Sequence, residues 1–177
     1  VTNVTNIDGS KVENISSTFD NLINIAKSKS TLENVSLRLL ATNLVYGEEW
    51  RDNMYIQAKH YRQLLQSTPK EVLALVDRTS LEKTTENLRK YRQESASNFV
   101  YSMYSRPTAF YGFEALDQIV VKRLGASDLI SFTYTTADPG ITQNTIKILE
   151  DELIKAYEIL RFSATNSAIA YFEEQVR

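Results

Sequence analysis

The sequence feature that most constrains the fold is one long helical pattern at the carboxyl-terminal side of the chain. Asp138 is a good N-cap, and Pro139 suits the first turn of a helix. Apolar residues then recur at helical spacing as far as Phe172. Such a helix has about forty residues and a length of roughly 60 Å. A domain of 177 residues cannot cover it, so we expect its far end to project or to pair with another subunit. The chain starts at Val1 and stops at Arg177 inside the pattern, and we therefore treat it as a piece of a larger protein.

The composition agrees with a helical domain. The chain has 5 glycines and 3 prolines, so sharp turns are few and long elements are expected. A hydrophobic fraction of 42% and a net charge of -2 are typical of one globular domain. The near-neutral charge argues against nucleic acid as a partner, because phosphate binding needs a basic face. The absence of cysteine excludes disulfides and thiolate metal sites.

We predict an α+β fold that is mostly helical and forms a single domain over residues 1–177. Residues 1–17 are rich in Asn, Thr and Ser and indicate a loop or linker, and residues 18–106 carry the helices. Residues 107–137 contain a strand pair, and the long helix occupies residues 138–177.

Capping patterns predict where the shorter helices begin. The predicted starts are Ser17 or Thr18, Ser30 with Glu33, Thr68 with Pro69 and Glu71, and Thr79 with Glu82. Gly47 is the predicted stop of the second helix. Mixed apolar patterns predict further helices over 48–66 and 96–104.

An antiparallel strand pair is predicted after Pro107. The first strand is placed at about 117–124, where β-branched residues cluster, and the second at about 128–136, where apolar and polar residues alternate. The segment between them, Gly125-Ala126-Ser127, is short enough for a hairpin turn.

Few residues suggest catalysis. His60 is the only histidine and cannot build a multi-histidine zinc site, so we interpret it as a surface or half-buried side chain. Adjacent carboxylates on a helix point about 100° apart and do not converge on one substrate. We interpret these clusters as solvated faces: Glu48-Glu49, Glu150-Asp151-Glu152 and Glu173-Glu174. No phosphate-binding loop or nucleophile elbow is present, so no catalytic, cofactor-binding or metal-binding residue is assigned.

Aromatic and basic residues leave two interpretations open. Tyrosines spread over several helices could line a sugar-binding face, but core or subunit contacts are the favoured interpretation. They are Tyr55, Tyr61, Tyr91, Tyr101, Tyr104 and Tyr111. The basic group Arg89, Lys90 and Arg92 is similarly interpreted as a solvated face and not as an anion site.

Several segments together resemble one protein family. Residues 19–28 and 31–35 resemble the membrane-proximal start of the polysaccharide co-polymerases, the chain-length determinant family. Residues 127–134, followed by Asp138-Pro139-Gly140, resemble the strand and Asp-Pro junction that lead into the family's long helix. Residues 170–175 look like that helix's Phe-Leu-Glu-Glu-Gln-type segment. The resemblance covers both ends of the chain, and the middle matches only as extra helix.

The resemblance implies a periplasmic α+β base between two inner-membrane helices, with a long helix that extends away from the membrane. It implies side-by-side homo-oligomers that control the length of O-antigen, capsule or exopolysaccharide made by a separate polymerase. Expected partners are therefore a second copy, the polymerase, the nascent glycan and, through flanking helices, the membrane. The family supplies no catalytic residue or cofactor, and the tyrosine kinase domain of some members has no motif here.

We therefore expect a non-enzymatic regulator of polysaccharide chain length at the periplasmic face of a bacterial inner membrane. The residues that match the family motif are Asp128, Tyr134, Asp138, Pro139 and Gly140. The residues expected to contact another protomer are Ile159, Ala168 and Phe172. The alternatives are a glycan hydrolase or lyase of the same export system, which needs two converging carboxylates, and a helical sensor or binding module.

Overall fold

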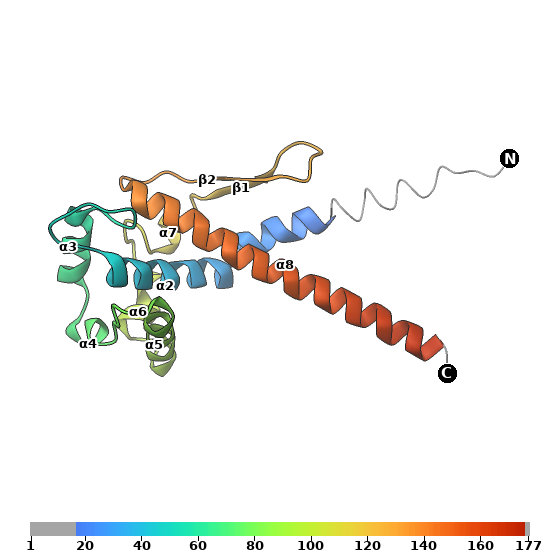
Figure 1. The fold of residues 1–177 in the computed structure, drawn as a ribbon, viewed down its shortest axis with the longest axis horizontal. Helices are drawn as coiled ribbons and strands as arrows, with labels where there is room; N and C mark the ends of the chain where they lie inside the picture. The colour runs from blue at the N-terminus through green and yellow to red at the C-terminus, as the bar shows by residue number, and fades with distance from the viewer. Residues whose placement is uncertain (1–16, 176–177) are drawn as a thin grey trace.

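A computed structural model describes residues 17–175, with residue 160 and residues 163–175 described as backbone only. The fold is mostly helical with one two-stranded antiparallel sheet, which confirms the predicted class. Figure 1 shows the helices gathered around α2, while α8 runs out of this body. After a helical segment at 17–26, the elements are α2 (Lys29–Tyr46), α3 (Ala58–Ser67), α4 (Lys70–Leu73), α5 (Leu81–Glu94), α6 (Phe99–Met103), α7 (Phe113–Leu116), β1 (Val120–Arg123), β2 (Ile130–Thr133) and α8 (Pro139–Gln175).

Helix α2 is the centre of the core. It is buried on most sides, and the polar Ser36, Thr42 and Asn43 are buried with its apolar residues. It packs against α8, α5 and α7, as Figure 1 also shows. The buried apolar residues of α2 are Leu32, Val35, Leu37, Leu39, Leu40, Ala41, Leu44 and Val45.

The strand pair is confirmed but is shorter than predicted. β1 and β2 pair from Val120↔Thr133 to Arg123↔Ile130, so the predicted limits of 117–124 and 128–136 are too wide. Gly125 has a φ of 58°, the left-handed conformation that glycine adopts at no steric cost. Residues 117–119 instead form the turn that leaves α7, and the ammonium of Lys27 donates to the Asp117 and Ile119 carbonyls there.

The predicted helix over 48–66 is wrong in its first half. Residues 47–57 form a loop, and α3 begins only at Ala58. The Asn53 side chain accepts hydrogen bonds from the backbone N–H groups of Tyr55 and Ile56, at 2.9 and 3.1 Å. Such local bonds offer the backbone an alternative to helix, because they satisfy the same donors.

Two N-caps lie one or two residues from their predicted positions. Ser28 caps α2 and Ser80 caps α5, and each accepts a hydrogen bond from the backbone N–H three residues later. Ser30 and Thr79 were the expected caps. Neighbouring Ser and Thr residues have the same capping chemistry, and the backbone conformation selects between them.

The segment around Pro69 also differs from the prediction. Thr68 does not start a helix: its hydroxyl donates to the Leu64 carbonyl at 2.7 Å and ends α3. Pro69 is the N-cap of α4 and not its first helical residue. The helix expected over 96–104 is α6, which Asn98 caps.

The observed elements can be placed along the predicted division of the chain. Helices fill the part of 18–106 outside the loops, the hairpin lies within 107–137, and α8 begins at Pro139. Of the linker predicted over 1–17, only Ser17 lies within the described residues, and it is helical.

Gly47 ends α2 as predicted, but for a steric reason. Its φ of -63° is ordinary, so no left-handed conformation requires glycine. A Cβ atom at Gly47 would lie 2.1 Å from Cδ2 of the buried Tyr61 ring. The close approach of α3 to the end of α2 therefore depends on this glycine.

We expect Gly47→Ala to destabilise the fold by about 1–3 kcal/mol, because the Tyr61 ring must shift within a packed core. Urea unfolding followed by circular dichroism measures the change. Gly125→Asn is the control, since a Cβ there meets open space and Asn tolerates positive φ. Equal losses for the two variants would contradict the steric explanation.

Candidate functional site

The predicted motif residue Asp138 lies fully buried at the start of α8. Its Oδ1 accepts hydrogen bonds from the backbone N–H groups of Gly140 and Ile141, at 3.0 and 3.2 Å. Its Oδ2 accepts from the Gln57 N–H at 2.9 Å and lies 2.7 Å from His60 Nδ1. The predicted cap is confirmed, and the same carboxylate also holds the residue that precedes α3.

The other motif residues complete this junction. Pro139 is the first residue of α8, as predicted. Gly140 allows close packing, because a Cβ there would lie 2.7 Å from the Tyr55 carbonyl carbon. Tyr134 is buried and follows β2 directly. Asp128 is different: it is exposed at the hairpin and lies 3.9 Å from Arg123 Nη2.

His60 is half-buried, which is one of the two interpretations offered by the sequence. An ionised carboxylate only accepts, so Nδ1 carries the proton that is donated to Asp138. The ring lines two cavities of about 350 and 250 Å³. Within residues 17–175, no hydroxyl or carboxyl group is hydrogen bonded to Nε2.

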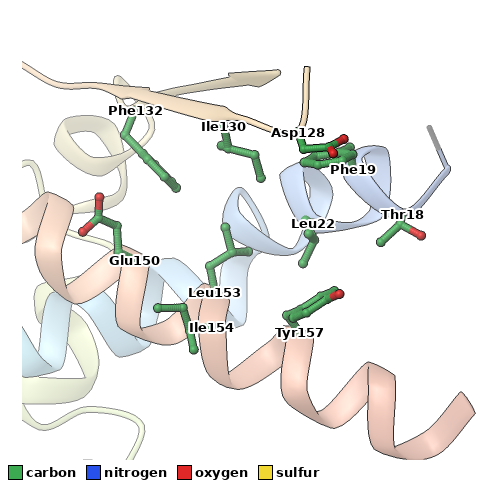
Figure 2. Close-up of a pocket in the computed structure, with 10 residues that line it drawn as sticks. All are labelled: Thr18, Phe19, Leu22, Asp128, Ile130, Phe132, Glu150, Leu153, Ile154 and Tyr157. Carbon is green, nitrogen blue, oxygen red and sulfur yellow. The ribbon is translucent and has the colours of Figure 1, made fainter. Parts of the chain in front are cut away.

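A larger apolar groove of about 680 Å³ lies between three elements. Figure 2 shows side chains from the 17–26 helix, from the hairpin and from α8 pointing into one space. Its lining is mainly aliphatic and aromatic, which is typical of a surface that binds apolar groups. The lining residues are Thr18, Phe19, Leu22, Asp128, Ile130, Phe132, Glu150, Leu153, Ile154 and Tyr157.

The groove does not bring its carboxylates together. In Figure 2, Glu150 lies below Phe132, whereas Asp128 lies beside Phe19, with Ile130 between the two carboxylates in the view. Glycoside hydrolysis needs two carboxyl groups on either side of one bond. The Arg123 guanidinium lies 4.4 Å from the centre of the Phe19 ring, so a cation–π contact joins the hairpin to the 17–26 helix at the groove.

Helix α8 continues beyond the body with its apolar residues uncovered. Leu153 is its last buried residue within the described side chains. Ile154 and Tyr157 form the edge of the groove, while Ile159 and Phe162 are 69% and 71% exposed. Ile154, Ile159 and Phe162 point within about 140° of one another around the helix, and they are called the α8 apolar face below. Of the predicted contact residues, Ile159 belongs to this face, while the side chains of Ala168 and Phe172 lie outside the described part.

The acidic triplet of α8 is not a solvated face, contrary to the prediction. Arg38 of α2 donates to Glu152 at 2.6 Å and to Asp151 at 3.0 Å, while Glu150 is exposed and the paired Asp151 side chain stays 45% exposed. The sequence could not show this pair, because more than one hundred residues separate the partners. The ion pair joins α2 to α8.

The other charged clusters also form pairs. Arg92 of the basic group binds Glu33 of α2 at 2.6 Å, so this residue bridges two helices. Arg89 and Lys90 bind Glu86 on their own helix and match the predicted solvated face. The Glu48-Glu49 pair is solvent-accessible as predicted, and the Glu173-Glu174 side chains lie outside the described part.

Most of the tyrosines considered for a sugar-binding face belong to the core. Tyr61, Tyr104 and Tyr111 are buried, and Tyr111 accepts a hydrogen bond from Asn43 Nδ2 at 2.8 Å. Burial raises the pKa of each of these three phenols above its usual value. Tyr55 and Tyr91 are half-buried and only Tyr101 is exposed, so the six do not form one face.

The described residues contain neither a metal-ligand cluster nor a membrane-spanning helix. Across residues 17–175, no three His, Cys, Asp or Glu side chains are grouped as metal ligands would be. In the same part of the chain, no helix combines the length and the apolar character needed to cross a bilayer.

Comparisons of the chain with protein-family models, with curated proteins and with solved structures gave no match. The site is therefore interpreted from its own geometry.

We expect Asp138→Asn to destabilise the protein by about 1.5–3 kcal/mol, because an amide cannot accept all four of the hydrogen bonds that the carboxylate accepts. Urea unfolding measures the change. Asp128→Asn is the matched control, since this carboxylate is exposed. A loss below about 0.5 kcal/mol for Asp138→Asn would contradict a central role for the carboxylate.

Alkaline unfolding tests the buried tyrosines. The unfolded chain loses phenol protons near pH 10, whereas burial raises the folded pKa of Tyr111. Stability is therefore complete below about pH 10 and falls as the pH rises further. We expect a shallower fall for Tyr111→Phe between pH 10 and 12 in urea titrations. Tyr101 is exposed, so Tyr101→Phe should leave the fall of stability with pH as it is in the unsubstituted protein. Equal falls for the unsubstituted protein, Tyr111→Phe and Tyr101→Phe would contradict the assignment of the fall to buried Tyr111.

Proposed function

We propose that the chain is the non-catalytic periplasmic region of an inner-membrane protein that regulates chain length in O-antigen, capsule or exopolysaccharide synthesis. The observation that carries the proposal is the α8 apolar face, which leaves the body uncovered beyond Leu153. Exposing isoleucine and phenylalanine side chains to water is unfavourable, and burying them against another chain is favourable. A helix built in this way is an assembly element.

The junction at the start of α8 supports the same proposal. The resemblance to polysaccharide co-polymerases depends on a strand, an Asp-Pro step and a long helix. In this protein, Asp138 holds that step with four hydrogen bonds, so the direction of α8 is fixed relative to the core. A fixed direction is what side-by-side protomers need, because each copy must present the same surface at the same angle.

The groove provides a neighbouring surface for such a contact. It is open and apolar, and Ile154 of the α8 apolar face forms part of its edge. A second copy of this chain is the occupant we propose. Oligomers formed in this way would present repeated periplasmic surfaces to the polymerase and the nascent glycan, and flanking membrane helices would hold them in the plane of the inner membrane.

Ile159→Glu combined with Phe162→Glu tests the assembly. We expect weaker self-association by at least about tenfold, because the charges must be buried at the contact, and an unchanged fold, because both side chains are exposed. Sedimentation velocity over a concentration series measures the association. Glu158→Gln is the control, since this residue is exposed and polar.

The functional part of the test uses the parent bacterium. The double variant should change the length distribution of its surface polysaccharide on gels, as deletion of the gene does, and Glu158→Gln should not. A protein that is monomeric at every concentration, or a polysaccharide profile that deletion leaves unchanged, would overturn the proposal.

A further inference from the structure

Two cavities adjoin at His60, and they share no lining residue with the groove beside α8. The larger cavity has a volume of about 350 Å³ and the smaller one about 250 Å³. Both are lined by His60, Gln63, Ala109 and Phe110. The larger volume is within the range of roughly 300–1,000 Å³ that is usual for small-molecule sites.

The larger cavity combines a buried apolar floor with an exposed polar rim. Leu64, Met103 and Phe110 line it and are buried. Gln63 and Arg106 line it and are exposed. A ligand can therefore enter from solvent and place an apolar face against the floor.

The His60 imidazole is held in one orientation between the two cavities. Nδ1 donates to the Asp138 carboxylate at 2.7 Å, so Nε2 of the neutral ring is an acceptor. Phe110 packs edge-on against the imidazole, with ring centres 5.0 Å apart. No hydroxyl or carboxyl group of residues 17–175 is hydrogen bonded to Nε2. This nitrogen can accept a hydrogen bond from a ligand hydroxyl.

The rim of the larger cavity offers both donors and acceptors. The Ser67 hydroxyl donates to the Leu64 carbonyl at 3.1 Å, and its oxygen can still accept. The Thr108 hydroxyl accepts from the Tyr111 N–H at 3.2 Å and can still donate. The Gln63 amide makes no side-chain hydrogen bond within residues 17–175. Such a mixture suits ligand hydroxyls, because a hydroxyl both donates and accepts.

Arg106 gives this cavity a positive charge. Its guanidinium lies 5.9 Å from the centre of the Phe99 ring, which lines the same cavity. No Asp or Glu is among the described residues that line the two cavities at His60. Arg106 also lines a third cavity with Glu114, but these two side chains form no ion pair. The guanidinium fork matches the two oxygens of a carboxylate, so an acidic ligand is favoured.

We propose that the cavities at His60 bind a uronic acid unit of a glycan, that is, a sugar ring that carries a carboxylate. The inference rests on the proposed function, which brings the chain to a nascent polysaccharide. Arg106 binds the carboxylate, while His60 Nε2 and the Gln63 amide bind ring hydroxyls. The C–H face of the ring packs on the floor at Phe110. The smaller cavity takes the next sugar of the same glycan.

This ligand uses both features of the site. A neutral sugar would leave the Arg106 charge without a partner in the cavity. A simple carboxylic acid would leave His60 and Gln63 without a hydroxyl to bind. Only a ligand with a carboxylate and several hydroxyls satisfies all three side chains.

The test uses His60 as a reporter, because it is the only histidine in the chain. In tag-free ¹³C-labelled protein, the imidazole C–H signals in NMR spectra report on this site alone. The probes are glucuronate, glucose, acetate and a β-1,4-linked glucuronate trisaccharide, all at one pH and one ionic strength. We expect a saturable shift with glucuronate and affinities at least about tenfold lower for glucose and acetate. The trisaccharide should bind at least about fivefold more tightly than glucuronate, because it reaches both cavities.

Two variants make the result specific. Arg106→Gln should lower the affinity for glucuronate by about tenfold and leave that for glucose unchanged, because only the carboxylate contact is lost. Gln63→Ala should weaken both sugars by about fivefold. Arg51→Gln is the matched control, since Arg51 is exposed and lines neither cavity. All variants should keep the circular dichroism spectrum of the unsubstituted protein, because the replaced side chains are exposed.

His60 signals that do not respond to glucuronate or to the trisaccharide would overturn the inference, as would an Arg106→Gln variant that binds glucuronate unchanged. An equal response to acetate would overturn the assignment of a sugar ring, and weaker binding of the trisaccharide than of glucuronate would overturn that of a glycan. The inference fails alone if His60 does not respond while Ile159→Glu with Phe162→Glu still reduces self-association and alters polysaccharide length. Loss of those two effects would instead remove the proposed function.

Discussion

One buried carboxylate, that of Asp138, determines how the parts of this protein are placed. It accepts two N–H bonds from the first turn of α8 and one from Gln57 before α3, and it binds His60. A buried charge is costly unless hydrogen bonds replace water, and four partners do so here. The carboxylate therefore ties the starts of two helices to one point, and the 47–57 loop between α2 and α3 follows from that constraint.

The direction of α8 depends on a second set of contacts along α2. Arg38 binds Asp151 and Glu152 and holds the middle of α8 against the core helix. Leu153 is the last residue of α8 whose described side chain is buried, and the apolar residues Ile154, Tyr157, Ile159 and Phe162 after it are exposed. The groove lies where the hairpin and the 17–26 helix flank α8 near Leu153. It therefore lies where α8 leaves the core.

The two ends of α8 have different tasks in the proposed function. The α8 apolar face, at the free end, would join neighbouring protomers, while the start of α8 is held against the core by Asp138. The same carboxylate orients the His60 imidazole at the proposed sugar site, so both proposals depend on it.

Local signals were sufficient for part of the fold. The cap at Asp138, the long helix, the hairpin at Gly125 and the stop at Gly47 each depend on residues close in sequence, and all four predictions are confirmed. The predicted helix over 48–66 failed in its first half, because apolar spacing does not reveal that Asn53 binds the backbone. Adjacent hydroxyl residues also made the caps of α2 and α5 ambiguous.

The mostly helical class, the strand pair and a final helix too long for its domain can be read from the chain, because periodicity and capping are local properties. Which groups meet depends on the tertiary fold. The Asp138–His60 contact joins residues 78 apart, and Arg38 reaches Asp151 across 113 residues. The tertiary fold also leaves Trp50 exposed while Tyr104 and Tyr111 are buried. Such outcomes depend on how helices cross, and the spacing of residues along one helix carries no information about its neighbours.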